Sequence, residues 1–144
     1  MKKIFLLKLI TIYIVSILCS CSKNKEVEEI ITDEEYETLT TIDGIMYNIC
    51  NTEVINSSSG TICCISGPLE AEVNDIIQFE YSGNLEGEVE VTWEVISGEL
   101  LLKNTNLNVA TFEVQEGFNG GSILSLGTSN SYVCSEAIEI TLIN

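Results

Sequence analysis

Short apolar runs alternate with polar clusters from Thr61 to the end of the chain. The runs are rich in Val, Ile, Tyr and Phe, and clusters of Gly, Asn and Ser separate them roughly every 8 to 12 residues. Because helical periodicity is absent here, the pattern predicts an all-β domain. The expected strands are Thr61–Ser66, Ile76–Tyr81, Glu88–Ile96, Glu99–Leu102, Leu107–Val114, Gly121–Thr128 and Cys134–Ile143.

The expected strand Glu88–Ile96 has the clearest alternation. Successive residues of a strand point to opposite sides of a sheet, so its apolar and polar side chains fall on opposite faces. The apolar set is Val89, Val91, Trp93 and Val95, and the polar set is Glu88, Glu90, Thr92 and Glu94. We therefore expect one face to be core, marked by Trp93, and the other to be hydrated.

The first 20 residues have the layout of an export signal. Lys2 and Lys3 precede the largely apolar run Ile4–Leu18. Lys8 interrupts this run, which is too short for a transmembrane helix because such a helix needs roughly 20 apolar residues. The segment 1–20 is thus predicted to be a signal peptide.

The end of this segment, Leu18-Cys19-Ser20-Cys21, resembles the lipobox of bacterial lipoproteins. The resemblance implies cleavage before Cys21 and lipid attachment to Cys21, which would anchor the mature protein to a membrane without a spanning helix. An ordinary secretory signal, or a buried apolar helix with Cys21 uninvolved, is the alternative.

Residues 21–41 are rich in Glu and Asp and poor in large apolar side chains. This composition predicts an extended, hydrated tether, and a short helix with a ragged apolar face is the alternative. The charged stretch Ser22–Glu29 resembles the signal that directs some Bacteroidota lipoproteins to the cell surface, although a plain spacer would have a similar composition.

The segment 42–60 has a weaker pattern. Ile45–Cys50 has the composition of a strand, and Asn56–Gly60 has that of a loop. Either the segment pairs at the edge of the domain, tied by Cys50, or it belongs to the tether. We favour the edge strand, because an unpaired thiol is a liability in an oxidising compartment.

The chain is strongly acidic, with 6 Lys and Arg against 22 Asp and Glu and a net charge of −16 at pH 7. Loss of the three lysines of the leader would take this charge to −19. Nucleic acid is therefore excluded as a partner, since phosphates are bound by Lys and Arg. The same charge repels anionic lipid head groups, so membrane attachment would depend on the lipid.

Four cysteines remain besides Cys19 and Cys21: Cys50, Cys63, Cys64 and Cys134. An even number in a small exported domain predicts disulfides. Cys134 shares its parity with Ile138, Ile140 and Leu142 and should face inward. We expect one of the neighbours Cys63 and Cys64 to bond Cys134 and the other to bond Cys50. A zinc site is the competing interpretation, but the chain has no histidine and no pair of CxxC motifs.

Several positions resemble the PKD-like, immunoglobulin-type β-sandwich modules of Bacteroidota surface and secreted proteins. They are Ile65-Ser66-Gly67-Pro68, Tyr81, Trp93-Glu94-Val95 followed by Gly98, and Cys134 ahead of a closing apolar strand. The resemblance implies a single antiparallel sandwich over residues 61–144. The Asp-Phe-Gly-Asp-Gly run of the best-known PKD domains is missing, and a cysteine precedes Gly67-Pro68 instead of following it.

Residues for catalysis are scarce. The absence of histidine excludes Ser/His and Cys/His arrangements, and no glycine-rich phosphate loop occurs. Glu88, Glu90 and Glu94 are explained by a hydrated sheet face. We expect neither an enzyme nor a resident cofactor. Calcium is the one metal considered, but Asp33, Asp43 and Asp75 are scattered and form no calcium-loop motif.

Together these features predict a lipid-anchored protein of the outer membrane, exposed at the cell surface, whose sandwich binds a protein or a glycan without catalysis. A structural accessory of an envelope complex is one alternative. A small inhibitor or immunity-type lipoprotein, whose acidity complements a basic enzyme, is another.

Overall fold

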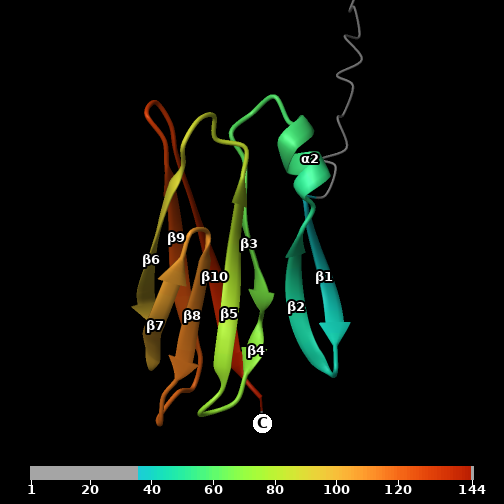
Figure 1. Cartoon of the computed structure of the whole chain (residues 1–144). Helices are drawn as coiled ribbons and strands as arrows, with labels where there is room; N and C mark the ends of the chain where they lie inside the picture. The colour runs from blue at the N-terminus through green and yellow to red at the C-terminus, as the bar shows by residue number, and fades with distance from the viewer. Residues whose placement is uncertain (1–35, 144) are drawn as a thin grey trace, which may run out of the picture. The chain divides into compact units, whose positions relative to one another are not determined.

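The computed structural model describes residues 36–143, which form strands and one short helix (Figure 1). The expected signal peptide, Cys21 and the tether as far as residue 35 lie outside the described residues. The elements are β1 (Glu37–Ile42), β2 (Ile45–Cys50), α2 (Thr52–Ser57), β3 (Cys63–Pro68), β4 (Glu70–Ala71), β5 (Ile76–Gly83), β6 (Glu90–Ser97), β7 (Leu100–Asn106), β8 (Val109–Val114), β9 (Gly121–Thr128) and β10 (Val133–Leu142).

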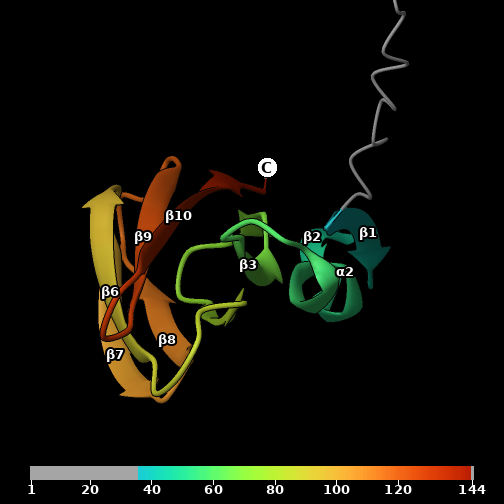
Figure 2. The same ribbon diagram turned by 90° about the horizontal axis from the view of Figure 1, so that it is seen from above.

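The strands form two packed sheets, so the prediction of an all-β, sandwich-like domain is confirmed. One sheet has six strands in the order β1-β2-β3-β5-β8-β7, and the other has four in the order β4-β10-β9-β6. Neighbouring strands are antiparallel except for β4 and β10, which are parallel. Seen from above, β1, β2 and α2 lie beside β3, away from β6 and β9 (Figure 2).

The core lies between the sheets and follows the alternation in the sequence. Phe79 of β5, Phe112 of β8 and Ile123 of β9 are fully or almost fully buried. Trp93 is buried as expected and packs edge-on against Phe112, with ring centroids 6.3 Å apart. The three valines of the same strand face also pack against this core: Val89, Val91 and Val95.

Two disulfides, Cys63–Cys134 and Cys50–Cys64, cross-link the domain. The first links β3 to β10, in the opposite sheet, and the second links β2 to β3. The two neighbouring cysteines have different partners because adjacent residues of a strand point to opposite faces. The predicted division of this pair between Cys134 and Cys50 is confirmed, and Cys134 packs against the core as expected.

The expected tether extends too far, because residues 37–41 lie in a strand. β1 pairs with β2 along its whole length, from Glu37 opposite Cys50 to Ile42 opposite Ile45. The intervening Asp43 and Gly44 have φ angles of 52° and 87°, the left-handed values that a tight hairpin turn needs. The segment 42–60 therefore pairs at the edge of the domain and is tied by Cys50, as favoured, but β1 is the outermost strand and Ile45–Cys50 the second.

The helix α2 was not expected, because its six residues lie in the segment predicted to lead into a loop. Asn51 caps it by accepting a hydrogen bond from the Val54 amide at 3.3 Å. Ile55 is 1% exposed and packs with Cys50 and Cys64 in a second, smaller core. The disulfide and this apolar contact stabilise a helix too short to persist alone.

The other differences concern strand ends. β4 is a separate two-residue strand, and β7 continues to Asn106 instead of ending at Leu102. β8 begins at Val109 and not at Leu107, because Leu107 and Asn108 form the turn between β7 and β8.

Candidate functional site

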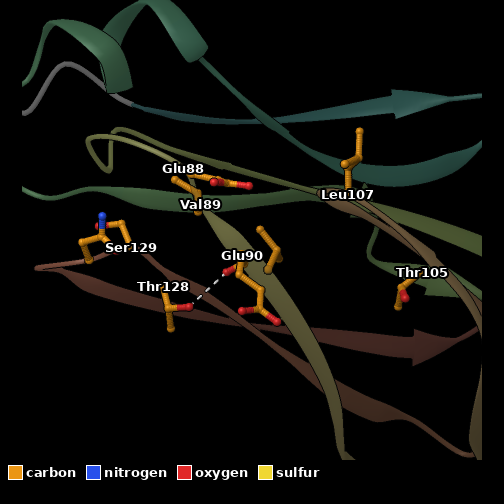
Figure 3. A pocket seen from close by; sticks show the side chains of 9 residues that line it. Glu88, Val89, Glu90, Thr105, Leu107, Thr128 and Ser129 are labelled. Atoms are coloured by element: carbon orange, nitrogen blue, oxygen red, sulfur yellow. Dashed lines mark hydrogen bonds between the residues drawn. The ribbon is translucent and has the colours of Figure 1, made fainter.

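A groove of about 610 Å³ opens at the end of the sandwich that carries the β7–β8 and β9–β10 turns (Figure 3). Three segments distant in sequence meet there: the start of β6, the β7–β8 turn and the end of β9 with the loop that follows. We call it the end groove, and its lining is Glu88, Val89, Glu90, Val91, Thr105, Leu107, Thr128, Ser129 and Asn130.

Leu107 is the most unusual residue of the end groove. Its side chain is 85% exposed, and its φ angle is 54°. In a two-residue hairpin turn this position favours glycine, because Cβ of an L-residue crowds the following carbonyl oxygen in the left-handed region. The turn therefore presents a large apolar side chain to solvent in a conformation that leucine disfavours.

Asn108 holds this turn against β5. Its side-chain amide donates hydrogen bonds to the carbonyl oxygen of Tyr81 at 3.0 Å and to the carboxylate of Glu80 at 3.1 Å. Its carbonyl oxygen accepts from the Tyr81 amide at 2.8 Å. With three hydrogen bonds to a central strand, the position of Leu107 is fixed by the fold.

The floor of the end groove is apolar and its walls are polar. Val89 and Val91 pack inward against the core. The Thr128 hydroxyl donates to the carbonyl oxygen of Glu90 at 3.4 Å and so ties the end of β9 to the start of β6 (Figure 3). The end groove is thus mostly polar, with the aliphatic side chains of Val89, Val91 and Leu107 among hydrogen-bonding groups.

The charge of the end groove is negative. Glu88 and Glu90 line it, and no cationic side chain does. The single lysine of the described part, Lys103, pairs with Glu113 at 2.6 Å. The end groove therefore suits a ligand that is apolar, neutral or positively charged, and it disfavours anions.

An adjoining hollow of about 470 Å³ shares Val89, Val91 and Leu107 with the end groove and reaches across β5 to Ile55 of α2. Tyr81 also lines it, yet the Tyr81 hydroxyl is buried without a hydrogen-bond partner. Burial raises the pKa of this phenol, so it stays neutral.

The structure brings together only some of the residues selected from the sequence. Glu88 and Glu90 line the end groove, whereas Glu94 is exposed elsewhere on β6. Leu107 was missed because it was expected to begin a strand. The asparagines on both sides of it were a usable signal, since such residues favour turns.

Two of the acidic residues considered for calcium, Asp43 and Asp75, lie among the described residues and belong to no cluster that could hold a metal ion. Asp43 occupies the β1–β2 turn, and the Asp75 carboxylate accepts a hydrogen bond from the Glu72 amide at 2.8 Å. Asp33 lies outside the described residues. Among residues 36–143, no three acidic or cysteine side chains are grouped closely enough to hold a metal ion.

The end groove presents hydroxyls, carboxylates and aliphatic side chains. The chain contains no histidine, and the four cysteines of the described part are all in disulfides. No nucleophile therefore has an imidazole base, and hydroxyls, carboxylates and apolar surface remain.

The described residues include no helix with the length and apolarity needed to cross a membrane. No protein-family model and no curated protein matches the chain.

Proposed function

We propose that this protein is a lipid-anchored envelope protein whose sandwich is a non-catalytic binding module, with the end groove as its ligand site. The observation that carries the proposal is the exposed Leu107, held at positive φ above the apolar floor. An exposed apolar side chain kept in a disfavoured conformation by three hydrogen bonds is costly for folding alone. Binding of a partner is the function that such a turn serves.

A protein ligand is favoured over a glycan. Leu107 and the two floor valines are aliphatic, and no aromatic side chain lines the end groove. Aliphatic surface is suited to the apolar side chains of a protein partner, while the surrounding carboxylates and hydroxyls accept or donate hydrogen bonds at the rim.

We further propose that β3 to β10 form an immunoglobulin-like sandwich of the PKD-like type. Strands A, B, E and D of a constant-type immunoglobulin sheet correspond in order to β3, β5, β8 and β7, and strands C, F and G correspond to β6, β9 and β10. A buried tryptophan on β6 also supports the proposal. The disulfide between the first and last strands and the added β1–β2 hairpin are departures from that plan.

The proposed location is the outer membrane, with lipid on Cys21 and the sandwich at the cell surface. The lipobox-like end of the leader and the acidic stretch after it support this location. The two disulfides are in keeping with an oxidising compartment outside the cytoplasm.

Protease treatment of intact cells tests the location. Cells expressing the wild type or Cys21→Ala are shaved with protease, and the membrane and released fractions are blotted. We expect loss of the wild-type signal and release of the variant from the membrane. Protection of the wild type until the outer membrane is broken would place the sandwich inside the envelope.

A binding comparison tests the end groove. Wild type, Leu107→Asp and the control Leu101→Asp are used to capture partners from surface-protein extracts and to probe a glycan array. Leu101 is 46% exposed on β7 and does not line the end groove. We expect Leu107→Asp to lose the ligand and Leu101→Asp to keep it, and equal capture by all three would refute the assignment.

A second candidate function is inhibition of a basic enzyme, favoured by the net charge of −16. Charge complementarity of this kind accelerates association and weakens with salt. A partner with a strongly basic surface, captured at low but not at high ionic strength, would support this function over adhesion.

A further inference from the structure

A second groove of about 280 Å³ runs between the β1–β2 hairpin and β10. We call it the hairpin groove, and the residues used below are Glu37 and Asn48 on the hairpin, Ile65 on β3, and Glu136, Ile138 and Glu139 on β10. It exists because the hairpin widens one sheet to six strands while the other sheet has only four. It shares no lining residue with the end groove.

The seam between β2 and β3 is loosely paired, and a side chain fills it. The only register pairs there are Tyr47 with Pro68 and Asn48 with Gly67. The Asn48 amide nitrogen donates to the carbonyl oxygen of Ile65 at 2.9 Å. A carbonyl oxygen can only accept, so this hydrogen bond fixes the orientation of the Asn48 amide.

The oxygen of the Asn48 side-chain amide has no hydrogen-bond donor. Asn48 is 6% exposed and lines the hairpin groove, and its Oδ1 has no hydrogen-bond partner. Leaving a buried acceptor unpaired is unfavourable, and such atoms are rare in folded proteins. The floor of the groove therefore lacks a donor.

Three carboxylates line the groove, and each is an acceptor; Glu136 lies on the inward parity of β10 and Glu139 on the outward parity. Glu37 comes from β1, while Glu136 and Glu139 come from β10. Glu136 lies between Cys134 and Ile138 on the inward parity of its strand, where an apolar side chain would be usual. Burial, and next the charge of Glu37, raise the pKa of Glu136, and no lysine lines the groove to offset this repulsion.

The backbone beside the groove has no neighbouring strand, although the Ala137 amide donates to the Glu136 carboxylate. β10 pairs with β4 only at Thr141 and Leu142, where the Thr141 amide donates to the carbonyl oxygen of Leu69 at 2.9 Å. Alternate residues of a strand point their N–H groups to the same edge, so those of Ala137 and Glu139 face the side on which β10 has no neighbouring strand. An extended polypeptide could add to this edge.

The shape of the groove favours an organic cation over a metal ion. In the part of the chain that the structure describes, no acidic cluster converges tightly enough for a metal. A volume of about 280 Å³ suits one long side chain and lies below the usual range for small-molecule sites. A guanidinium or ammonium group supplies several donors and a positive charge to a site of acceptors only.

We propose that the hairpin groove binds an arginine or lysine side chain from an extended basic segment of a partner protein, with Glu37, Glu136 and Asn48 receiving its donors. The apolar wall contributed by Ile138 contacts the methylene stem of the side chain. The proposal concerns a different surface from the end groove and does not depend on it.

The test uses the full-length protein and a capped pentapeptide with one central arginine flanked by valine and serine. Binding is followed by fluorescence anisotropy at physiological ionic strength and by the NMR signal of the Asn48 side-chain amide. We expect Glu136→Gln and Glu37→Gln to weaken binding by about tenfold each, as loss of a charged hydrogen-bond partner does. The matched control Glu94→Gln, on the exposed face of β6, should change the affinity less than about twofold.

Replacement of the arginine by citrulline, which keeps most donors but not the charge, should weaken binding as well. Equal losses in all three glutamine variants would overturn the proposal by showing attraction to the overall negative charge. Binding that appears only after Lys23→Ser and Lys25→Ser would overturn it in favour of the protein's own N-terminal segment. Leu107→Asp should leave the affinity for the arginine peptide unchanged. The test of the hairpin groove can therefore fail independently of the test of the end groove.

Discussion

At the level of single residues, the contact between Tyr81 and Gly127 limits what β9 can carry. A Cβ atom built on Gly127 would overlap the end of the Tyr81 ring. Gly127 is therefore needed for space, since the ring of Tyr81 occupies the room between β5 and β9.

We predict that Gly127→Ala destabilises the domain by about 1–3 kcal/mol, the usual range for overpacking. Tyr81→Phe alone should be neutral or slightly stabilising, because it removes a buried hydroxyl without a partner. In the double variant, part of the loss should be recovered, since the phenylalanine ring is shorter. Urea unfolding measures all three, and strictly additive effects would contradict the proposed overlap.

The position of Glu136 leads us to predict that the stability of the domain depends on pH. Burial, and next the charge of Glu37, raise the folded-state pKa of Glu136 above the ordinary value of a glutamate. The folded protein therefore binds the Glu136 proton more tightly than the unfolded chain does. The stabilisation that this proton gives the folded state is complete below the pKa of Glu136 in the unfolded chain, and it is lost as the pH rises through the pKa in the folded protein. Glu136→Gln should thus raise the melting temperature at pH 7 and have little effect below about pH 4.

Thermal unfolding across this pH range provides the measurement. Glu94→Gln is the control, because Glu94 is exposed on β6. The gain for Glu136→Gln is expected to be below about 1 kcal/mol, since solvent screens a partly exposed carboxyl. An equal gain at both pH values would show that burial of the charge is not the cause.

Among the elements, the β7–β8 turn should couple stability to the proposed binding. Leu107→Gly should stabilise the domain by up to about 1 kcal/mol, because relief of the left-handed conformation exceeds the added flexibility of the unfolded chain. The same change removes the exposed side chain, so ligand capture should fall while the melting temperature rises. Asn108→Ala should lower stability by contrast, since it removes two side-chain hydrogen bonds to β5.

The strands with strict alternation were predictable, whereas the short elements were not. The expected β9 agrees at both ends, and β6 and β10 agree within two residues. The apolar period of two predicts β6, whereas β9 buries Ile123, Ser125 and Gly127, and its ends are marked by the flanking turn residues Gly120 and Ser129. β4 has only two residues, and α2 depends on the Cys50–Cys64 bridge and Ile55, so neither leaves a local period to detect.

The candidate sites were harder to predict than the strands. The inward position of Glu136 follows from the same parity that placed Cys134 in the interior. The role of Asn48 could not be predicted from parity, because it depends on where β2 meets β3. Only two residue pairs define that seam. The Asp43-Gly44 turn was a local signal for β1 that the acidic composition of the preceding segment obscured.

For the whole molecule, the two disulfides should differ in their contribution to stability. Cys63–Cys134 spans 71 residues of sequence and Cys50–Cys64 spans 14. In the chain-entropy model these contribute about 4 and 3 kcal/mol. The paired serine variants, tested by urea unfolding, should follow that order.

The two bridges should also differ in what their loss exposes. Removal of Cys50–Cys64 is expected to free β1, β2 and α2 to exchange amide hydrogens while β5 and β9 stay protected. Uniform exchange throughout the domain would instead indicate that the hairpin and the sandwich unfold as a unit.

For a protein exported as proposed, the adjacent cysteines also affect how the disulfides form. An oxidant that joins cysteines in the order in which they emerge from the translocon meets Cys50 first and then Cys63 and Cys64 together, at almost equal distance. Sequence distance does not determine which of Cys63 and Cys64 bonds Cys50. The opposite orientations of their side chains determine it, and these exist only once β3 has formed. Maturation should therefore depend on a disulfide isomerase, and cells lacking one should accumulate a form with a Cys50–Cys63 bond and free thiols at positions 64 and 134.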